Sequence, residues 1–183
     1  ERRALHFLQR LAGLATAPRN FASITAKSGI AILDTRKTTP NLRILEKYAV
    51  KTGGGLNHRM GLYDGILLKE NHIESAGSIG KALEQAIAGR KPGMKIEVET
   101  RSIQEVEEAL RYSPDIIMLD NFKPLEIIKA IKVINEACEI EVSGKINEKN
   151  IRDYAIRGIN YISIGAITHS AKALDISLEI RPA

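Results

Sequence analysis

The feature that most limits the fold of this chain is a regular alternation of short apolar runs with segments of helical period. The runs are rich in Ile, Val and Leu and lie at 29–34, 65–69, 95–99, 115–120, 139–143 and 160–165. Between the later runs, apolar residues recur at helical spacing, as in SIQEVEEALRY, PLEIIKAIKVINEA and NEKNIRDYAIRG. Strands separated by single helices indicate a parallel βα array, so the sequence predicts an α/β fold.

Residues that favour helix ends stand at the borders of these segments. Ser102 and Asn147 suit N-caps or first turns, Pro124 suits a first turn, and Gly158 suits a helix stop. The opening segment ERRALHFLQRLAGLAT has Leu at helical spacing and predicts a leading helix over 1–16.

Polar or small residues end the successive runs, and their distribution distinguishes two kinds of parallel array. In a barrel every strand ends at one shared mouth, whereas an open sheet concentrates its site at one switch point. Because all six run ends carry a residue that could contribute to one shared site, we expect a TIM-like α/β barrel of about six to seven parallel strands. Either this barrel is incomplete, or a further strand lies in TAPRNFASITAKSG. The run-ending residues are Asp34, Lys69, Glu99, Asp120, Ser143 and Gly165.

Composition favours one domain over 1–183 and excludes several classes of protein. Hydrophobic residues make up 44% and charged residues 27% of the 183 residues, as in a globular domain. No apolar run is long enough to span a bilayer, so we expect no membrane. Cys138 is the only cysteine, which excludes an internal disulfide and suits a reducing, cytoplasmic location.

The basic charge has two possible meanings. A net charge of +5 and a pI near 9.3 raise nucleic acid as a partner. However, the basic residues are spread along the chain, Trp is absent, and aromatic residues make up only 4%. Since stacking platforms are missing, we expect no nucleic acid and instead a small anionic substrate.

The segment 34–73 gathers cationic residues at loop positions and around glycines at 53–55. Cations from separate loops are typical of a site for a small, multiply charged ligand. Ordinary solvated surface cations are the simpler alternative. The consecutive glycines favour the site, because a backbone close to a ligand needs such freedom. The cationic residues are Arg36, Lys37, His58, Arg59 and Lys69.

Two further groups lie at later run ends. Glu99 and Asp120 end consecutive runs, so they could hold Mg²⁺, bind sugar hydroxyls or act as acid and base; helix capping is the alternative. EVSGKIN and SIGAITHS place small residues at the last run ends, as in the phosphate sites of barrels, although ordinary tight turns also use glycine. His169 could contact such a phosphate or cap locally.

These residues resemble a known family. DTRKTTPNLRILEKYAVKTGGGLNHRMGLYDGILLKENHI is similar to the signature of the quinolinate phosphoribosyltransferases, also called nicotinate-nucleotide pyrophosphorylases. IEVET, IIMLDNF, EVSGKIN and ISIGAITHSAKALDISLEI follow in the family's order. The resemblance implies an enzyme of NAD biosynthesis that makes nicotinate mononucleotide, pyrophosphate and CO₂ from quinolinate and 5-phosphoribosyl-1-pyrophosphate with Mg²⁺. It also implies an N-terminal α/β sandwich domain of about a hundred residues, absent from this chain, which opens without Met.

The resemblance assigns roles residue by residue. The quinolinate carboxylates would be held by Arg36, His58, Arg59 and Lys69, and Arg2 would reach the site of a neighbouring subunit in a homo-oligomer, at least a dimer. Lys37 would contact the pyrophosphate, and Glu99 and Asp120 would hold the ribose hydroxyls and the metal. The 5-phosphate would be surrounded by Ser143, Gly144, Gly165 and His169. The catalytic residues would be Lys37, Lys69, Glu99 and Asp120.

Two alternatives stay open. The first is a Schiff-base aldolase on the same barrel, with Lys69 as nucleophile. The second is a diverged, non-catalytic paralogue that binds a phosphosugar. The intact set of basic residues argues against both alternatives, because neither an aldolase nor a phosphosugar-binding protein needs a cationic site for a dicarboxylate.

Overall fold

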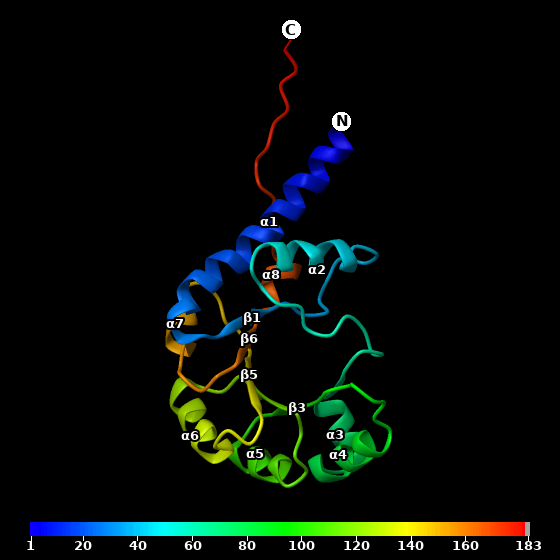
Figure 1. Cartoon of the computed structure of the whole chain (residues 1–183), viewed down its shortest axis with the longest axis vertical. Coiled ribbons are helices and arrows are strands. Elements are labelled where there is room, and N and C mark those ends of the chain that lie inside the picture. The colour runs from blue at the N-terminus through cyan, green and yellow to red at the C-terminus, as the bar shows by residue number, and fades with distance from the viewer. Residues whose placement is uncertain (182–183) are drawn as a thin grey trace.

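The computed structural model describes residues 1–181, and its strands and helices alternate along the chain (Figure 1). The strands are β1 Ala31–Leu33, β2 Ile66–Leu68, β3 Ile96–Thr100, β4 Ile116–Asp120, β5 Glu139–Ser143 and β6 Tyr161–Ser163. The helices are α1 Arg2–Thr25, η1 Ala26–Ser28, α2 Arg43–Thr52, α3 Glu70–Ala76, α4 Ile79–Ala88, α5 Ile103–Leu110, α6 Pro124–Ile134, α7 Ile151–Tyr154 and α8 Ala166–His169. Each predicted apolar run contains one strand.

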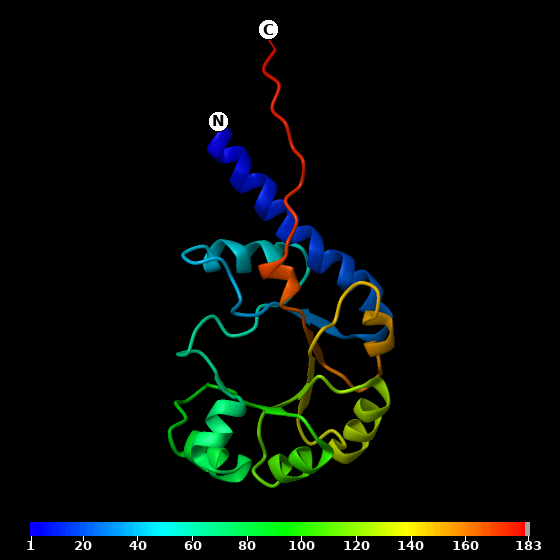
Figure 2. The ribbon, with the colours of Figure 1, turned by 180° about the vertical axis from the view of Figure 1, so that it is seen from behind.

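The strands form one parallel sheet that curls into an incomplete barrel with the helices outside it (Figures 1 and 2). The order β1-β6-β5-β4-β3-β2 follows the chain around a ring, with β1 beside β6. β1 and β2 are not paired with each other. On this open side Leu56 pairs with β1 instead, donating its N–H to Ile32 at 2.8 Å and accepting from Asp34 at 3.1 Å. The predicted incomplete TIM-like barrel is confirmed.

The leading helix is longer than predicted, and the possible strand in TAPRNFASITAKSG is wrong. Residues 16–25 continue α1, and η1 ends the segment. Pro18 lies inside α1 and is buried. Its ring packs against the chain at 53–55. This tertiary contact stabilises the helix, although proline by itself disfavours a helix interior.

Gly53 and Gly55 pack against α1, whereas the Cβ position of Gly54 faces open space. A Cβ on Gly53 would lie 1.9 Å from the Ala15 carbonyl oxygen, and one on Gly55 would lie 3.0 Å from Pro18 Cβ. Gly54 has φ +88°, which L side chains rarely adopt. The prediction that these glycines press against a ligand is therefore wrong; they allow the end of α2 to meet α1.

The predicted helix starts agree with the structure at α5 and α6 and differ at α7. Ser102 caps α5 by accepting from the Glu105 N–H, and Pro124 is the first residue of α6. Asn147 instead precedes a turn, and α7 covers only Ile151–Tyr154. Gly158, with φ +103°, lies in the turn before β6 and not at a helix end.

The core lies between the sheet and the outer helices, where alternate strand residues are apolar and buried, including Val98, Ile117, Leu119, Val142 and Ile162. The intervening residues face the barrel interior and are mostly polar there, including Glu97, Glu99, Glu141 and Ser163. Alternation of period two thus separates an apolar layer from a polar interior.

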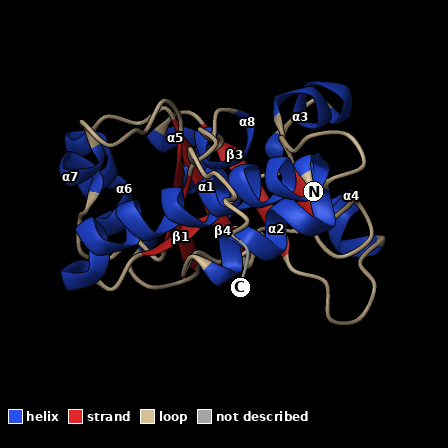
Figure 3. Ribbon diagram, turned by 90° about the horizontal axis from the view of Figure 1, so that it is seen from above, coloured by secondary structure: helices blue, strands red, loops and turns tan. Residues whose placement is uncertain are grey.

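The first turns of α1 and the C-terminal segment project from one side of the barrel (Figure 1), so both chain ends lie in front of the barrel in the view from above (Figure 3). Gln9 joins them, since its Nε2 donates to the Ile176 carbonyl at 2.9 Å and its own carbonyl accepts from Leu174 at 3.0 Å. Among the described residues, no helix combines the length and the apolar character that crossing a membrane requires.

Candidate active site

Most of the predicted site residues line one cavity at the carboxyl ends of the strands. The cavity has a volume of about 700 Å³. Parallel strands bring their ends together, so residues far apart in sequence share this mouth. The predicted residues that line it are Lys37, Lys69, Glu99, Asp120, Ser143, Gly144, Gly165 and His169.

The acidic side of the mouth contains a lysine–glutamate ion pair. Lys69 lies between β2 and α3, and its Nζ donates to Glu99 Oε2 at 2.9 Å. Arg101 approaches the other oxygen of Glu99 at 3.5 Å and pairs with Glu70 at 2.5 Å. Asp120 accepts from the Asn121 amide at 2.7 Å. The Lys69 side chain is half exposed, so a substrate anion could reach its ammonium group.

The opposite side of the mouth is shaped by glycines. Gly144 has φ +109°, and a Cβ there would lie 2.4 Å from Asn121 Oδ1, so only glycine suits this position. A Cβ on Gly165 would lie 3.2 Å from His169 Nε2 and 3.5 Å from Lys37 Cδ. Gly165 therefore lets a lysine and a histidine approach the backbone at the end of β6, a donor set suited to phosphate oxygens.

Arg36 and Arg59 are partly buried and incompletely paired. Arg59 Nη1 donates to the Gly65 carbonyl at 3.0 Å. The Nε atoms of both arginines are buried without a hydrogen-bond partner among the described residues. Burial, and then the positive charge of Arg36, lower the pKa of Arg59, so each cation disfavours the other. An anion between them would relieve both the repulsion and the unpaired donors.

A buried ion pair anchors the segment that carries Arg59. Lys47 on α2 is 1% exposed, and its Nζ donates to Asp34 at 2.5 Å and to the His58 carbonyl at 2.8 Å. Asp34 also accepts from the Asn57 amide at 2.7 Å and the His58 N–H at 2.8 Å. Burial lowers the pKa of Lys47, and the bond to Asp34 opposes that shift. Sequence reading did not single out Lys47, although its place beside Ala49 and Val50 on a buried helix face was a possible signal.

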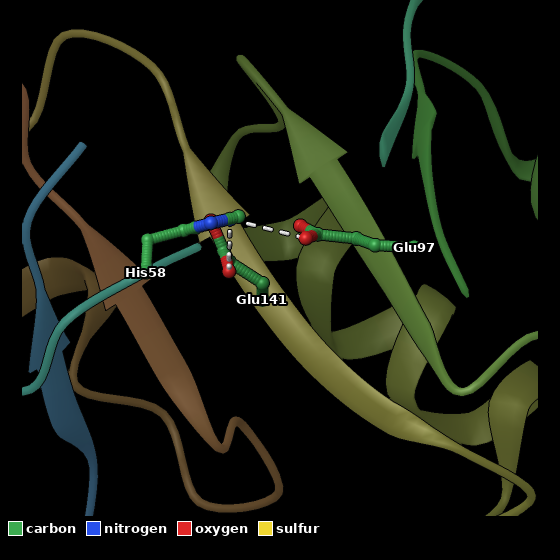
Figure 4. Close-up of side chains that lie close together, drawn as sticks. All are labelled: His58, Glu97 and Glu141. Carbon is green, nitrogen blue, oxygen red and sulfur yellow. Dashed lines mark ion pairs between the residues drawn. The ribbon is translucent and has the colours of Figure 1, made fainter. Parts of the chain in front are cut away.

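His58 does not line the mouth cavity, and its ring points toward Glu97 of β3 and Glu141 of β5 (Figure 4). Its Nε2 is 3.0 Å from Glu97 Oε2 and 3.6 Å from Glu141 Oε2. The three residues and Arg59 line a second cavity of about 490 Å³. Burial, and then the charge of Glu97, raise the pKa of Glu141 to about 8. Burial lowers the pKa of His58, but the hydrogen bond to Glu97 and the charge of Glu141 outweigh it, and the net direction is upward.

Glu97 and Glu141 were missed because glutamate in a strand usually faces solvent. The available signal was the alternation in IEVET and EIEVS, which places Glu97 and Glu141 on the same face as the predicted mouth residues Glu99 and Ser143.

Arg2 lies in the first turn of α1, is exposed and lines neither cavity. The resemblance places the role of Arg2 in the site of a neighbouring subunit, which a single chain does not contain. Arg36 also lines neither cavity, but its charge acts on Arg59.

Comparisons with known proteins give one consistent result. Residues 14–179 match the family model described as quinolinate phosphoribosyl transferase, C-terminal domain. A probable nicotinate-nucleotide pyrophosphorylase (carboxylating) of Bacillus subtilis is 44% identical over 98% of this chain and 62% of its own length. A mitochondrial quinolinate phosphoribosyltransferase (decarboxylating) of Nicotiana glauca is 43% identical over 98% of this chain and 56% of its own length.

A solved structure agrees with these sequences. NadC from Streptococcus pyogenes superposes with a TM-score of 0.94 and 46% identity over 98% of this chain and 63% of that one. The chain thus spans 56–62% of the length of the curated relatives named above. Family match, identity and superposition cover nearly all of the chain, which belongs to the quinolinate phosphoribosyltransferase family and corresponds to its C-terminal barrel domain.

Proposed function

We propose that this chain provides the barrel of an enzyme that transfers the phosphoribosyl group of 5-phosphoribosyl-1-pyrophosphate to quinolinate, with loss of CO₂. The observation that supports this best is that the buried Nε groups of Arg36 and Arg59 have no hydrogen-bond partner within residues 1–181. Two guanidinium groups that repel each other bind a dicarboxylate well, because each can pair with one planar carboxylate. Lys69, which lines the mouth cavity, would provide a third cation for the quinolinate carboxylates.

The mouth cavity suits the phosphoribosyl donor. Gly144 and Gly165 let the 5-phosphate approach the backbone, with Ser143 and His169 as donors. Glu99 and Asp120 would accept from the ribose hydroxyls, and Lys37 would contact the pyrophosphate. We regard Lys37, Lys69, Glu99 and Asp120 as the catalytic set.

The two carboxylates at the mouth also suit Mg²⁺. Mg²⁺ in proteins is typically held by one or two carboxylates together with substrate phosphates, and Glu99 and Asp120 line one cavity. When bound, Mg²⁺ would neutralise negative charge on the leaving pyrophosphate.

The chemistry requires positioning more than acid–base catalysis. Departure of pyrophosphate from the ribose leaves positive character on the sugar, so the ring nitrogen of quinolinate must already face it. The arginine pair would fix that orientation, and Lys37 would stabilise the charge of the leaving group. When the bond between the ring and its 2-carboxylate breaks, CO₂ leaves, the pyridinium stabilises the electron pair that remains on the ring carbon, and a proton from solvent takes the place of the carboxylate.

The oligomeric state and the cellular location are also proposals. Large apolar side chains are exposed on α2 and the following loop, including Ile44, Tyr48, Leu62 and Tyr63. Such a patch supports a homo-oligomer, in which Arg2 would reach a neighbouring site. A cytoplasmic location, proposed from the single cysteine, contrasts with the mitochondrial name of the Nicotiana glauca relative.

The two alternatives are less well supported. Lys69 donates to Glu99 at 2.9 Å, as an ammonium group does, whereas a Schiff-base aldolase needs a free amine at this position. A phosphosugar-binding paralogue would have no use for the arginine pair. Borohydride trapping of a carbonyl substrate tests the first alternative, and a quinolinate binding measurement tests the second.

The decisive experiment uses the natural full-length protein that contains this chain. Quinolinate, 5-phosphoribosyl-1-pyrophosphate and Mg²⁺ are supplied, and release of CO₂ and pyrophosphate is measured. We expect both products in equal amounts. Absence of both, with quinolinate binding also absent, would reject the proposal.

A further inference from the structure

Both ring nitrogens of His58 are engaged within the protein. The Arg59 backbone N–H donates to Nδ1 at 2.7 Å, so Nδ1 acts as an acceptor. Nε2 is 3.0 Å from Glu97 Oε2, and since a carboxylate only accepts, Nε2 must carry a proton. Glu141 is 3.6 Å from Nε2, too far for a hydrogen bond.

These contacts select one form of the imidazole. A doubly protonated ring would have an N–H on Nδ1 facing the Arg59 N–H, and two donors cannot face each other at 2.7 Å. The carboxylates favour protonation of His58, but that proton would displace the Arg59 backbone. The observed arrangement therefore corresponds to the neutral ring with its proton on Nε2.

The same geometry argues against a metal ion between His58, Glu97 and Glu141, whose ligand atoms lie within 4.8 Å of one another. Ligation by Nε2 requires the proton to move to Nδ1, because a neutral imidazole keeps one N–H. A proton on Nδ1 is incompatible with the Arg59 N–H. The cluster therefore suits a hydrogen-bonded unit better than a cation site.

We propose that Glu97 is a positioning residue: it accepts the Nε2–H of His58, fixes the tautomer that receives the Arg59 N–H, and so holds Arg59 where a substrate carboxylate binds. Glu97 is 4% exposed and lines the interior cavity with Arg59, not the mouth, and its contact with His58 is the one through which it would position Arg59. His58 then orients Arg59 and has no free ring nitrogen for a quinolinate carboxylate. The inference about the substrate rests on the proposed function, whereas the inference about the tautomer does not.

The surroundings of His58 support this role. Its backbone N–H and carbonyl are held by Asp34 and Lys47, so the residue is anchored at its main chain as well as its ring. Arg59 follows directly, with Nη1 on the Gly65 carbonyl and Nε unpaired. Fixing His58 therefore limits the positions that the Arg59 guanidinium can reach.

The first test is ¹⁵N NMR of histidine-labelled, full-length protein, which distinguishes the two neutral tautomers and the doubly protonated ring. We expect the Nε2–H tautomer for His58 at neutral pH in the wild-type protein and in Glu97→Gln, because the amide oxygen still accepts. Glu97→Ala should lose this signature. A doubly protonated His58 in the wild type, or stoichiometric Zn²⁺ binding that displaces the Nε2 proton, would overturn the proposal.

The second test compares Michaelis constants in the same variants. Glu97→Ala should raise KM for quinolinate by about tenfold or more, and Glu97→Gln should restore it, while KM for 5-phosphoribosyl-1-pyrophosphate stays within about twofold. The matched control is Glu139→Ala, which removes a glutamate bound to Lys95 and Tyr161 and does not touch His58. Equal changes in both Michaelis constants, or no change in Glu97→Ala, would contradict positioning through Arg59.

The two tests fail independently. If the wild-type protein does not turn over quinolinate, the proposed function fails but the tautomer is still measured. If Glu97→Ala does not fold, the wild-type spectrum and Glu97→Gln still decide whether His58 is held as the Nε2–H form.

Discussion

The mouth of the barrel and its interior both contain charged residues, but these side chains differ in their exposure to solvent. At the mouth, Lys69 and Glu99 form an ion pair whose lysine is half exposed, beside a cavity open to ligands. Away from the mouth cavity, Lys47 on α2 and Asp34 after β1 are 1% and 0% exposed, and Glu141 inside the barrel is fully buried. Exposed pairs contribute little to stability, whereas removing one partner of a buried pair is costly. The mouth is therefore suited to binding and the interior to holding the loop that binds.

This contrast predicts that mouth substitutions change activity at little cost in stability, whereas substitutions of the buried charges change stability and affect activity only through the loop that they hold. Four substitutions test it, taken from the largest expected effect to the smallest.

Lys69→Ala should reduce turnover of quinolinate by at least about a hundredfold, because it removes a charge that we place at the reacting groups. Its half-exposed side chain adds little to stability, so the melting temperature should change little. Steady-state kinetics and thermal unfolding of full-length protein measure both. Wild-type activity in Lys69→Ala or in Arg59→Ala would remove these residues from the proposed site.

Lys47→Ala should lower the free energy of unfolding by about 3–5 kcal/mol, because it leaves the Asp34 carboxylate buried and without its cation. Urea denaturation measures the change, and Lys51→Ala is the matched control, since Lys51 is an exposed lysine on the same helix. A loss no larger than that of the control would mean that Asp34 does not need Lys47.

Glu141→Gln should change how stability depends on pH. Burial and Glu97 raise the folded-state pKa of Glu141 from 4.5 to about 8, so its contribution to stability is fully present below about 4.5 and is lost as the pH rises toward 8. Glutamine cannot ionise, so the variant should lack this fall. Unfolding free energies measured from pH 5 to 8 test the difference; parallel curves for variant and wild type would contradict a buried, protonated Glu141.

Glu99→Gln should change the free energy of unfolding by no more than about 1 kcal/mol: the Glu99 side chain is 8% exposed, but its partners Lys69 and Arg101 are about half exposed and stay solvated, and glutamine keeps the volume of the side chain. Chemical denaturation at low and high salt provides the measurement. A loss comparable to that of Lys47→Ala would remove the distinction between mouth and interior.

Much of the site could be predicted because the relevant signals are local. Asp120 and Ser143 each end an apolar run, and parallel strands necessarily bring such ends to one mouth. The same reasoning failed for the glycines at 53–55, whose contacts are with α1, a segment far away in sequence. The resemblance assigns His58 to the quinolinate carboxylates, which stays a prediction; the contact of its ring with Glu97 inside the barrel was not predicted.

The sequence by itself determined the parallel βα order, the incomplete barrel, the residues at its mouth and the family, because each depends on periodicity or on a contiguous motif. Only the tertiary structure decided that Lys47 is buried on Asp34 and that His58 bonds to Glu97. These contacts join residues from different elements across the open side of the barrel, where no strand pairing fixes the register. Which partner a buried charge finds there depends on the packing of the whole chain.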